Sequence, residues 1–279
     1  MHVSLSKVTK SFTGRDGKHT ALAEVNLEIA SGSFVCLVGP SGCGKTTLLN
    51  LIAGFDRQSS GQVLLDGEPV AGPGPDRVVL FQDPALFPWL NVAENVGFPL
   101  EQLALSTDEK RRRVEEALRM VHLYRFRSAQ PHELSGGMRA RAAIARALVM
   151  EPKVMLMDEP FAALDAHTRE LLQQEVERAW QRTGATIVFI THDNREAVRL
   201  ATDVVVMGTR PGRVKLSLNV EQDLPRPRDP YDRNLSLLVT RVARELQIEI
   251  EKIAREESDD RPPPQPPVPS RGPDFGRDI

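Results

Sequence analysis

The chain lacks the features that define several common classes of protein. It has only two cysteines, Cys36 and Cys43, and they lie too close together in the sequence to suggest a disulfide framework or a zinc site. Its 36 basic and 38 acidic residues nearly cancel, so no large positive field favours nucleic acid. No run of about 18 apolar residues occurs, and the first ten residues lack the apolar core of a signal peptide. We therefore expect a soluble protein of a reducing cytosol that does not have nucleic acid as its partner.

Short apolar segments rich in Val, Leu and Ile alternate with longer segments of helical period. This alternation is typical of a mainly parallel sheet covered by helices, so the predicted fold class is α/β. The clearest predicted strands are apolar and end in polar or Gly-containing turns: 34–38, 78–81, 154–157 and 186–190. Each of them leads into a motif that carries candidate functional residues.

The strand pattern stops between about residues 88 and 150, where helical patterning takes over. In TDEKRRRVEEALRMVHL, Thr107 is placed to cap a helix, and the basic residues 110–113 begin its solvated face. The pattern predicts an α-helical subdomain inserted at about 88–150 in a domain of residues 1–228.

The C-terminal part of the chain divides into two segments of different character. Residues 229–257 are predicted to form a helical extension that packs on the body, because five apolar side chains share one helical face: Leu235, Leu238, Val242, Leu246 and Ile253. Residues 258–279 are rich in proline and poor in apolar side chains, so they are predicted to be a disordered tail.

The strongest motif is GPSGCGKT at residues 39–46, between the strand FVCLV and the helical segment TTLLNLIAGF. It matches G-x-x-x-x-G-K-[ST] in the context that the motif requires, which makes a Gly-rich turn that merely packs the weaker interpretation. The backbone N–H groups would surround a phosphate, Lys45 would reach the β- and γ-phosphates, and Thr46 would offer its hydroxyl to Mg²⁺. The candidate nucleotide-binding residues here are Gly39, Pro40, Ser41, Gly42, Cys43, Gly44, Lys45, Thr46 and Thr47.

Two adjacent carboxylates end the apolar strand in VMLMDEP, residues 154–160. Buried apolar residues rarely lead into such charges unless a cation or a reacting water meets them; a solvated turn is the alternative. We expect Asp158 to support Mg²⁺, and Glu159 to orient or deprotonate the attacking water.

A third motif is LSGGM, in which Ser135, Gly136 and Gly137 stand immediately before a helix. The hydroxyl and the exposed N–H groups would point at an anion, whereas an ordinary helix cap is the simpler interpretation. Its position about 20 residues before the carboxylate strand favours the anion site.

With these motifs in this order, the chain resembles the ATP-binding-cassette (ABC) ATPase family over roughly residues 3–220. The family's other motifs match Gln82 in VVLFQDP, Asp165 in AALD and His192 in FITHD, and its adenine-stacking aromatic matches Phe12 in VTKSF. The resemblance implies a P-loop NTPase core with an antiparallel β subdomain. It also implies that ATP and Mg²⁺ bind, and that the signature LSGGM of one subunit closes over the nucleotide of a second copy or a paralogue.

The later motifs have simple interpretations beside the functional ones. A glutamine after a strand is often only polar surface, but the place of Gln82 favours metal or water sensing. His192 is suited to hydrogen bonding to a γ-phosphate, although a histidine at a strand end is commonly a satisfied surface residue. Phe12 is either the adenine-stacking ring or a core aromatic.

Three residues depart from the family pattern or add to it. Met138 replaces the commonest glutamine of the signature and Ala162 the common serine before Asp165, and neither change removes the Ser135 hydroxyl. Cys43 lies in the phosphate loop, where Lys45 and a helix N-terminus are expected to lower its pKa, so that alkylation would compete with nucleotide.

A narrower resemblance involves LFPWLNVAENVGFPL, LSGGMR, THDNREAVRLATDVVVMGTRPGRV and LPRPRDP. These segments look like the nitrate, sulfonate and taurine branch of importers, which implies a membrane permease, an extracytoplasmic solute-binding protein and a location on the cytoplasmic face of the membrane. An exporter of lipid or metal and a soluble, non-transport ABC protein are the alternatives. Residues 82–96, which include Phe87, Pro88, Trp89 and Leu90, are expected to expose an apolar patch that receives a permease helix.

Overall fold

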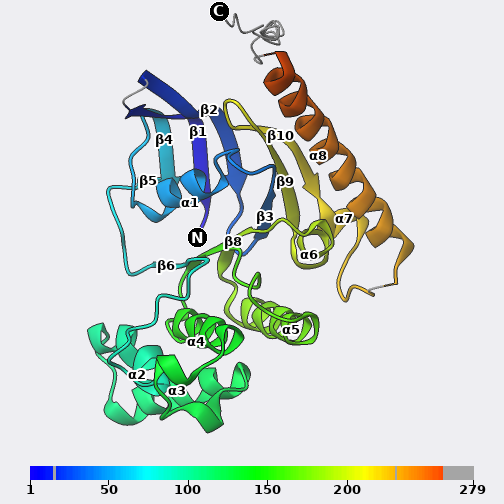
Figure 1. Cartoon of the computed structure of the whole chain (residues 1–279). Coiled ribbons are helices and arrows are strands. Elements are labelled where there is room, and N and C mark those ends of the chain that lie inside the picture. Colours follow the sequence, from blue (N-terminus) through cyan, green and yellow to red (C-terminus); the bar gives the residue numbers. More distant parts are fainter. Residues whose placement is uncertain (15–16, 230, 260–279) are drawn as a thin grey trace, which may run out of the picture.

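Two sheets make up the body at the top of Figure 1, in a computed structural model that describes residues 1–14, 17–229 and 231–259. The larger sheet has the order β10-β9-β3-β8-β7-β6, and its neighbours from β9 to β6 pair in parallel while β10 is antiparallel to β9. Its strands are β3 (Phe34–Val38), β6 (Arg77–Leu80), β7 (Val154–Asp158), β8 (Thr186–Ile190), β9 (Asp203–Gly208) and β10 (Arg213–Asn219). This sheet confirms the predicted α/β class.

The smaller sheet is antiparallel, with the order β2-β1-β4-β5. Its strands are β1 (Val3–Gly14), β2 (Gly17–Ile29), β4 (Ser60–Leu65) and β5 (Glu68–Pro69). The pairing of β1 with β2 shifts register three times, and Lys7 and Glu24 have positive φ angles of 50°. These irregularities break the alternation of buried and exposed residues that would have marked the strands in the sequence.

Both faces of the larger sheet are covered at its inner strands, which explains why β3, β7, β8 and β9 are almost entirely buried and apolar, whereas the edge strand β10 alternates with exposed residues. In β3, Phe34, Cys36 and Val38 join one buried cluster, while Val35 and Leu37 join another. The second cluster includes residues of α1 (Lys45–Ala53), which packs between the two sheets. The first cluster continues into buried residues of the helical subdomain, which lies below the sheets in Figure 1.

The lower region of Figure 1 holds the helical subdomain that was predicted at about 88–150. It contains α2 (Val92–Gly97), α3 (Thr107–Met120), α4 (Gly136–Leu148) and the 3₁₀ turns η1 (Phe98–Gln102), η2 (Tyr124–Phe126) and η3 (Pro131–Glu133). The expected cap of α3 is wrong by one residue. Ser106 is the cap, and its hydroxyl accepts from the Glu109 N–H at 3.2 Å.

Four helices complete the body: α5 (Ala166–Thr183), α6 (Asn194–Leu200), α7 (Val220–Asp223) and α8 (Arg233–Asp259). The long helix α8 packs on α6 and β9. Of the five apolar residues predicted on its packed face, Leu235, Leu238 and Val242 are buried, whereas Leu246 and Ile253 are only half-buried. The helix begins at Arg233, later than the predicted 229, and runs two residues past the predicted end at 257. The predicted disordered tail, residues 258–279, overlaps the helix at its first two residues, and residues 260–279 lie outside the described residues.

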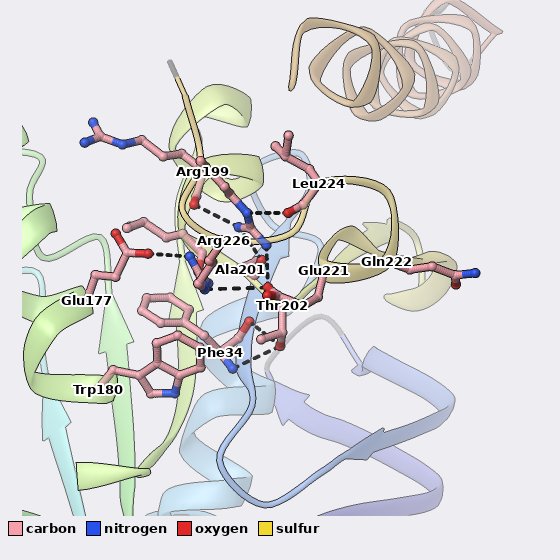
Figure 2. Close-up of polar contacts among 12 residues, drawn as sticks. Phe34, Glu177, Trp180, Arg199, Ala201, Thr202, Glu221, Gln222, Leu224 and Arg226 are labelled. Carbon is pink, nitrogen blue, oxygen red and sulfur yellow. Dashed lines mark hydrogen bonds and ion pairs between the residues drawn. The ribbon is translucent and has the colours of Figure 1, made fainter. Parts of the chain in front are cut away.

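Residues 224–229 fasten the chain after α7 to the end of α6 (Figure 2). Arg228 donates to the carbonyls of Val198, Arg199 and Ala201 at 3.0, 2.8 and 2.7 Å, and to that of Leu224 at 2.8 Å. Three of these carbonyls are at the C-terminal end of α6, where carbonyl groups have no partner within the helix. A guanidinium from 27 to 30 residues away therefore caps α6.

Arg226 extends the same contact to α5. Its guanidinium lies 4.7 Å from the centre of the Trp180 ring, pairs with the Glu177 carboxylate and donates to the Leu200 carbonyl at 2.6 Å. Trp180 in turn packs edge-on against Phe34 of β3 and donates its indole N–H to the Gly32 carbonyl. The two arginines thus join α5, α6 and the central strand.

Candidate nucleotide site

The loop between β3 and α1 has a backbone that requires glycine. Gly42 and Gly44 have φ angles of +77° and +91°, which side chains other than hydrogen rarely permit. At Gly39, an added Cβ would lie 2.6 Å from the Cys43 Sγ and 2.7 Å from the Met207 carbonyl oxygen. The loop is therefore folded on itself and pressed against β9, with its end at the N-terminus of α1.

Lys45 holds its ammonium group within this loop. The Nζ atom donates to the carbonyl oxygens of Gly39 at 2.8 Å and Pro40 at 3.1 Å. These bonds place a positive charge beside the backbone that leads into α1, where the helix dipole also favours an anion. The loop has the chemistry of a phosphate site.

Thr46 connects the loop to the carboxylate strand. Its hydroxyl donates to the Asp158 Oδ2 at 2.8 Å, so the start of α1 meets the end of β7. Burial raises the pKa of Asp158, and the Thr46 hydrogen bond only partly opposes this effect. A half-buried carboxylate beside a hydroxyl is a pair of oxygen ligands suited to a hard cation.

Glu159 and His192 face each other at the neighbouring strand ends. The His192 Nδ1 lies 3.2 Å from the Glu159 Oε2, and the Glu159 N–H donates to the Ile190 carbonyl across β8 at 3.0 Å. Glu159 has a φ of +47°, an uncommon backbone conformation for this residue. The bend turns its carboxylate away from the strand and toward the histidine.

Two further candidates are helix caps. The Ser135 hydroxyl accepts from the Met138 N–H at 3.2 Å at the start of α4, and the Asp165 carboxylate accepts from the Thr168 N–H at 3.0 Å at the start of α5. The backbone hydrogen bond from Thr168 lowers the pKa of Asp165. The chain itself leaves open space at Gly136, since an added Cβ would meet nothing nearer than 4.0 Å.

The structure brings some of the predicted site residues together and keeps others apart. Residues 39–47, Asp158, Glu159 and His192 meet at the ends of β3, β7 and β8, and exposed Gln82 follows the edge strand β6. Ser135, with Gly136 and Gly137, begins α4 in the helical subdomain, whereas α1 lies in the upper body (Figure 1). Within one chain, the signature motif LSGGM therefore does not lie at the phosphate loop.

The structure supports the prediction of an available ring at Phe12 but contradicts the prediction of a reactive thiol at Cys43. Phe12 is 44% exposed on β1, with the Lys10 ammonium 4.7 Å from its ring centre, so it is not a core aromatic. Cys43 is fully buried, and this burial raises the pKa of its thiol although Lys45 opposes the effect. The expectation of a lowered Cys43 pKa is wrong, because desolvation of the thiolate outweighs the nearby positive charge.

Sequence reasoning missed the turn that supports the phosphate loop from behind. Gly212, between β9 and β10, approaches the Cys43 carbonyl so closely that an added Cβ would lie 2.2 Å from it. Its N–H donates to the Ala21 carbonyl at 2.9 Å. The only signal in the sequence was a glycine in the turn GTRPGR, and such a glycine is more often needed for the turn alone.

A glycine-rich loop at a helix start, an adjacent lysine and threonine, and two strand-end carboxylates define a P-loop nucleoside triphosphatase. The family model described as ABC transporter matches residues 22–162. The chain is 47% identical over 227 residues to an uncharacterized ABC transporter ATP-binding protein of Methanocaldococcus jannaschii, which covers 81% of this chain and 84% of that protein. The chain therefore belongs to the ABC transporter ATP-binding family and is an ATPase.

Relatives with named roles and solved structures agree with this assignment. A taurine import ATP-binding protein of Burkholderia pseudomallei is 48% identical over 75% of this chain and 80% of its own length. A nitrate import ATP-binding protein of Synechocystis is 45% identical over 82% of this chain and 87% of its own length. A dimeric ATP-binding cassette bound to ADP and Pi matches with a TM-score of 0.71 and 35% identity, covering 78% of this chain and 98% of that one.

Proposed function

We propose that this chain is the ATP-hydrolysing subunit of an importer for a small anion of the nitrate, sulfonate or taurine type. The taurine and nitrate import proteins described above support the direction of transport and the class of cargo. The cargo does not touch this subunit, so the evidence for it rests on those relatives. The nucleotide chemistry rests on this chain's own residues.

The observation that carries the proposal is the meeting of the phosphate loop with the ends of β7 and β8. Lys45 and the N–H groups of residues 39–47 bind the phosphates of ATP, and exposed Phe12 stacks on the adenine. Glu159 orients or deprotonates the attacking water, while His192, 3.2 Å from it, donates a hydrogen bond to the γ-phosphate. Exposed Gln82 senses the metal or the water from the edge strand β6.

The residues fit a bound Mg²⁺ ion. Asp158, whose pKa is raised by burial, is stabilised as a carboxylate by a nearby cation, and the Thr46 hydroxyl lies 2.8 Å from it. These two side chains, with Gln82, would hold the ion. When bound, it neutralises charge on the β- and γ-phosphates.

A second ATPase subunit completes the site. Ser135, Gly136 and Gly137 offer a hydroxyl, exposed N–H groups and open space at a helix start, but they stand apart from the loop of their own chain. They would contact the nucleotide held by the partner, and Asp165, which caps α5, would lie at the same interface. The relative solved as a dimer with ADP and Pi supports this arrangement.

A permease docks on the helical subdomain, which places the subunit at the cytoplasmic face of the membrane. A groove of about 780 Å³ is lined by residues of α2, α3 and η1, among them Phe98 and Val114, and by Leu90, which precedes α2. Trp89 beside it is 72% exposed, and its ring centre lies 5.5 Å from that of Phe87; apolar side chains exposed as a group mark interaction surfaces. The exposed apolar patch is narrower than the predicted range of residues 82–96, because Val92 and Val96 are buried. Among the described residues, no helix is long and apolar enough to cross a bilayer itself.

The site is tested by the substitution Glu159→Gln in the full chain. We expect normal ATP binding and hydrolysis slower by about 10²-fold or more, because the water loses its carboxylate while the phosphate loop remains. Glu68→Gln, on an exposed strand, is the matched control and should keep the wild-type rate. Wild-type turnover of the Glu159→Gln protein would refute the role.

The transport assignment has a separate test. The full chain, isolated from membranes, should bring with it a multi-spanning permease, and the transport system should include an extracytoplasmic solute-binding protein that binds nitrate, a sulfonate or taurine. Recovery of the chain without any membrane partner would favour a soluble ABC protein instead. A lipid or metal ion as the transported cargo would contradict the importer assignment.

A further inference from the structure

Three polar side chains beneath His192 are buried and have no part in the site described so far. Thr191 is 2% exposed, Gln173 5% and Glu196 8%. Buried polar groups of this kind are costly unless they bond to one another, so their arrangement is specific. They join the loop that carries His192 to helix α5.

The carboxylate of Glu196 is the centre of this network. Its Oε1 accepts from the Gln173 Nε2 at 2.7 Å, and its Oε2 accepts from the Thr191 hydroxyl. The Thr191 oxygen in turn accepts from the Asp193 N–H at 3.0 Å. The residues on both sides of His192 are thus bonded, directly or through one hydroxyl, to one carboxylate.

The other end of the network fixes Gln173 on α5. The Arg199 Nη1 donates to the Gln173 Oε1 at 3.3 Å, which leaves the amide nitrogen to face Glu196. Gln173 lies about two turns after Asp165, the residue that caps α5. The network therefore connects the helix that begins at Asp165 with the helix that follows His192.

The start of α6 is fixed by the same residues. Asp193 caps α6 by accepting from the N–H groups of Arg195 and Glu196 at 2.9 and 3.1 Å. His192 itself is exposed, and in the part of the chain that the structure describes its side chain contacts Glu159, with 3.2 Å between Nδ1 and Oε2. An exposed side chain with one contact depends on its backbone for its position.

We infer that the buried Gln173–Glu196 pair positions His192 against Glu159 and transmits movements of the helix after Asp165 to this histidine. The inference rests on the proposed role of His192 and adds two positioning residues to it. Without the pair, the loop 191–193 loses its internal anchor while the phosphate loop, on another strand, is unaffected. The expected result is impaired turnover with unimpaired binding of ATP.

Exchange of the two side chains provides a sharp test, because the hydrogen bonds need one carboxylate and one amide. In Glu196→Gln, the new amide has one acceptor oxygen for two donors, the Gln173 amide and the Thr191 hydroxyl. If that oxygen faces Thr191, two amide nitrogens meet; if it faces Gln173, the Thr191 hydroxyl loses its acceptor. Turning Gln173 over would bring its nitrogen against Arg199. In Gln173→Glu, two buried carboxylates face each other. In the double variant, Glu at 173 accepts from Arg199 and from Gln at 196, whose oxygen accepts from Thr191. All three bonds and the net charge are restored.

The measurements are kcat and KM for ATP hydrolysis, the Kd for ATP, and the thermal midpoint of the full chain. We expect each single variant to lower kcat about tenfold, with KM and Kd within about twofold, and the double variant to recover kcat to within about twofold. Thr191→Val, which removes only the hydroxyl, should lower kcat similarly and serves if a single variant fails to fold. The control Gln247→Glu alters an exposed amide–carboxylate contact on α8 and should leave kcat unchanged.

Two outcomes would overturn the inference. One is wild-type kcat in the folded single variants and in Thr191→Val. The other is a double variant that recovers the thermal midpoint but not kcat, which would make the pair structural only. His192→Ala separates the two levels of proposal: if it keeps wild-type kcat, the role of His192 fails, and if it alone lowers kcat, only the positioning pair fails.

Discussion

Two arginine-rich segments of this chain have similar chemistry and opposite surroundings. On α3, Arg111, Arg112 and Arg119 pair with glutamates three or four residues away, and their side chains are 77%, 55% and 55% exposed. In LPRPRDP, Arg226 and Arg228 are 12% and 2% exposed and bind groups from other elements. The two segments make a similar number of ion pairs, but we expect the buried arginines of LPRPRDP to contribute much more to the stability of the fold than the exposed arginines of α3.

The difference lies in what each guanidinium replaces. On α3, water would solvate an arginine as well as its partner does, so these pairs contribute little even though Arg112 lowers the pKa of Glu109 to about 2. Arg228 is out of reach of water and satisfies four carbonyl oxygens and the Glu221 carboxylate. Burial lowers its pKa to about 10, so it remains charged at neutral pH. Its loss would leave buried acceptors without donors.

The largest effect is expected from Arg228→Lys, which keeps the charge but not the planar fork of donors. A lysine has one ammonium and cannot reach all these carbonyl groups, so we expect a loss of about 3 kcal/mol in the free energy of unfolding. Urea unfolding of the full chain measures it. A variant as stable as the wild type would show that water or a rearranged backbone satisfies the end of α6, and the contrast between the two segments would break down.

A smaller effect is expected from Arg226→Lys. Arg226 stacks on Trp180 and pairs with Glu177, but within the described residues it donates to a single backbone carbonyl, that of Leu200. A lysine retains the ion pair and part of the cation–π contact, so the expected loss is about 1 kcal/mol in the same urea experiment. A loss equal to that of Arg228→Lys would show that the stacked ring, rather than the capped carbonyls, is the main anchor.

The same contrast shows what the sequence predicts and what it does not. The phosphate loop, Asp158 and Glu159 were predicted because their motifs are local: each follows a strand whose apolar run is visible without knowledge of the rest. The role of Arg228 was not predicted, because its partners Val198, Arg199 and Ala201 lie about 30 residues away and contribute only backbone atoms. In the sequence LPRPRDP, two arginines among prolines look like an exposed turn. The partners of Glu196 and Gln173, which lie on different helices, were hidden for the same reason.

The antiparallel sheet was expected from family resemblance alone, and the reason is again non-local. Bulges at Lys7 and Glu24 disrupt the alternation of buried and exposed residues in β1 and β2. The strands can therefore be recognised only when the pairing of the two strands is known. The cap of α3 was placed one residue too late because Ser106 and Thr107 are both good caps. A local pattern does not decide between two neighbouring hydroxyls.

The smallest effect is expected from Arg112→Ala, which completes the comparison. Arg112 pairs with both Glu109 and Glu116 on the surface of α3, so a count of ion pairs alone would rank it level with Arg226, which also has two carboxylate partners. We expect the thermal midpoint of the full chain to change by less than about 2 °C, because solvent replaces both contacts and alanine is a good helix former. The same variant measured in 1 M NaCl should differ even less from the wild type, since salt screens exposed pairs. A loss of stability comparable to that of Arg228→Lys would show that the network on α3 acts as a unit and that exposure does not decide the value of an arginine in this protein.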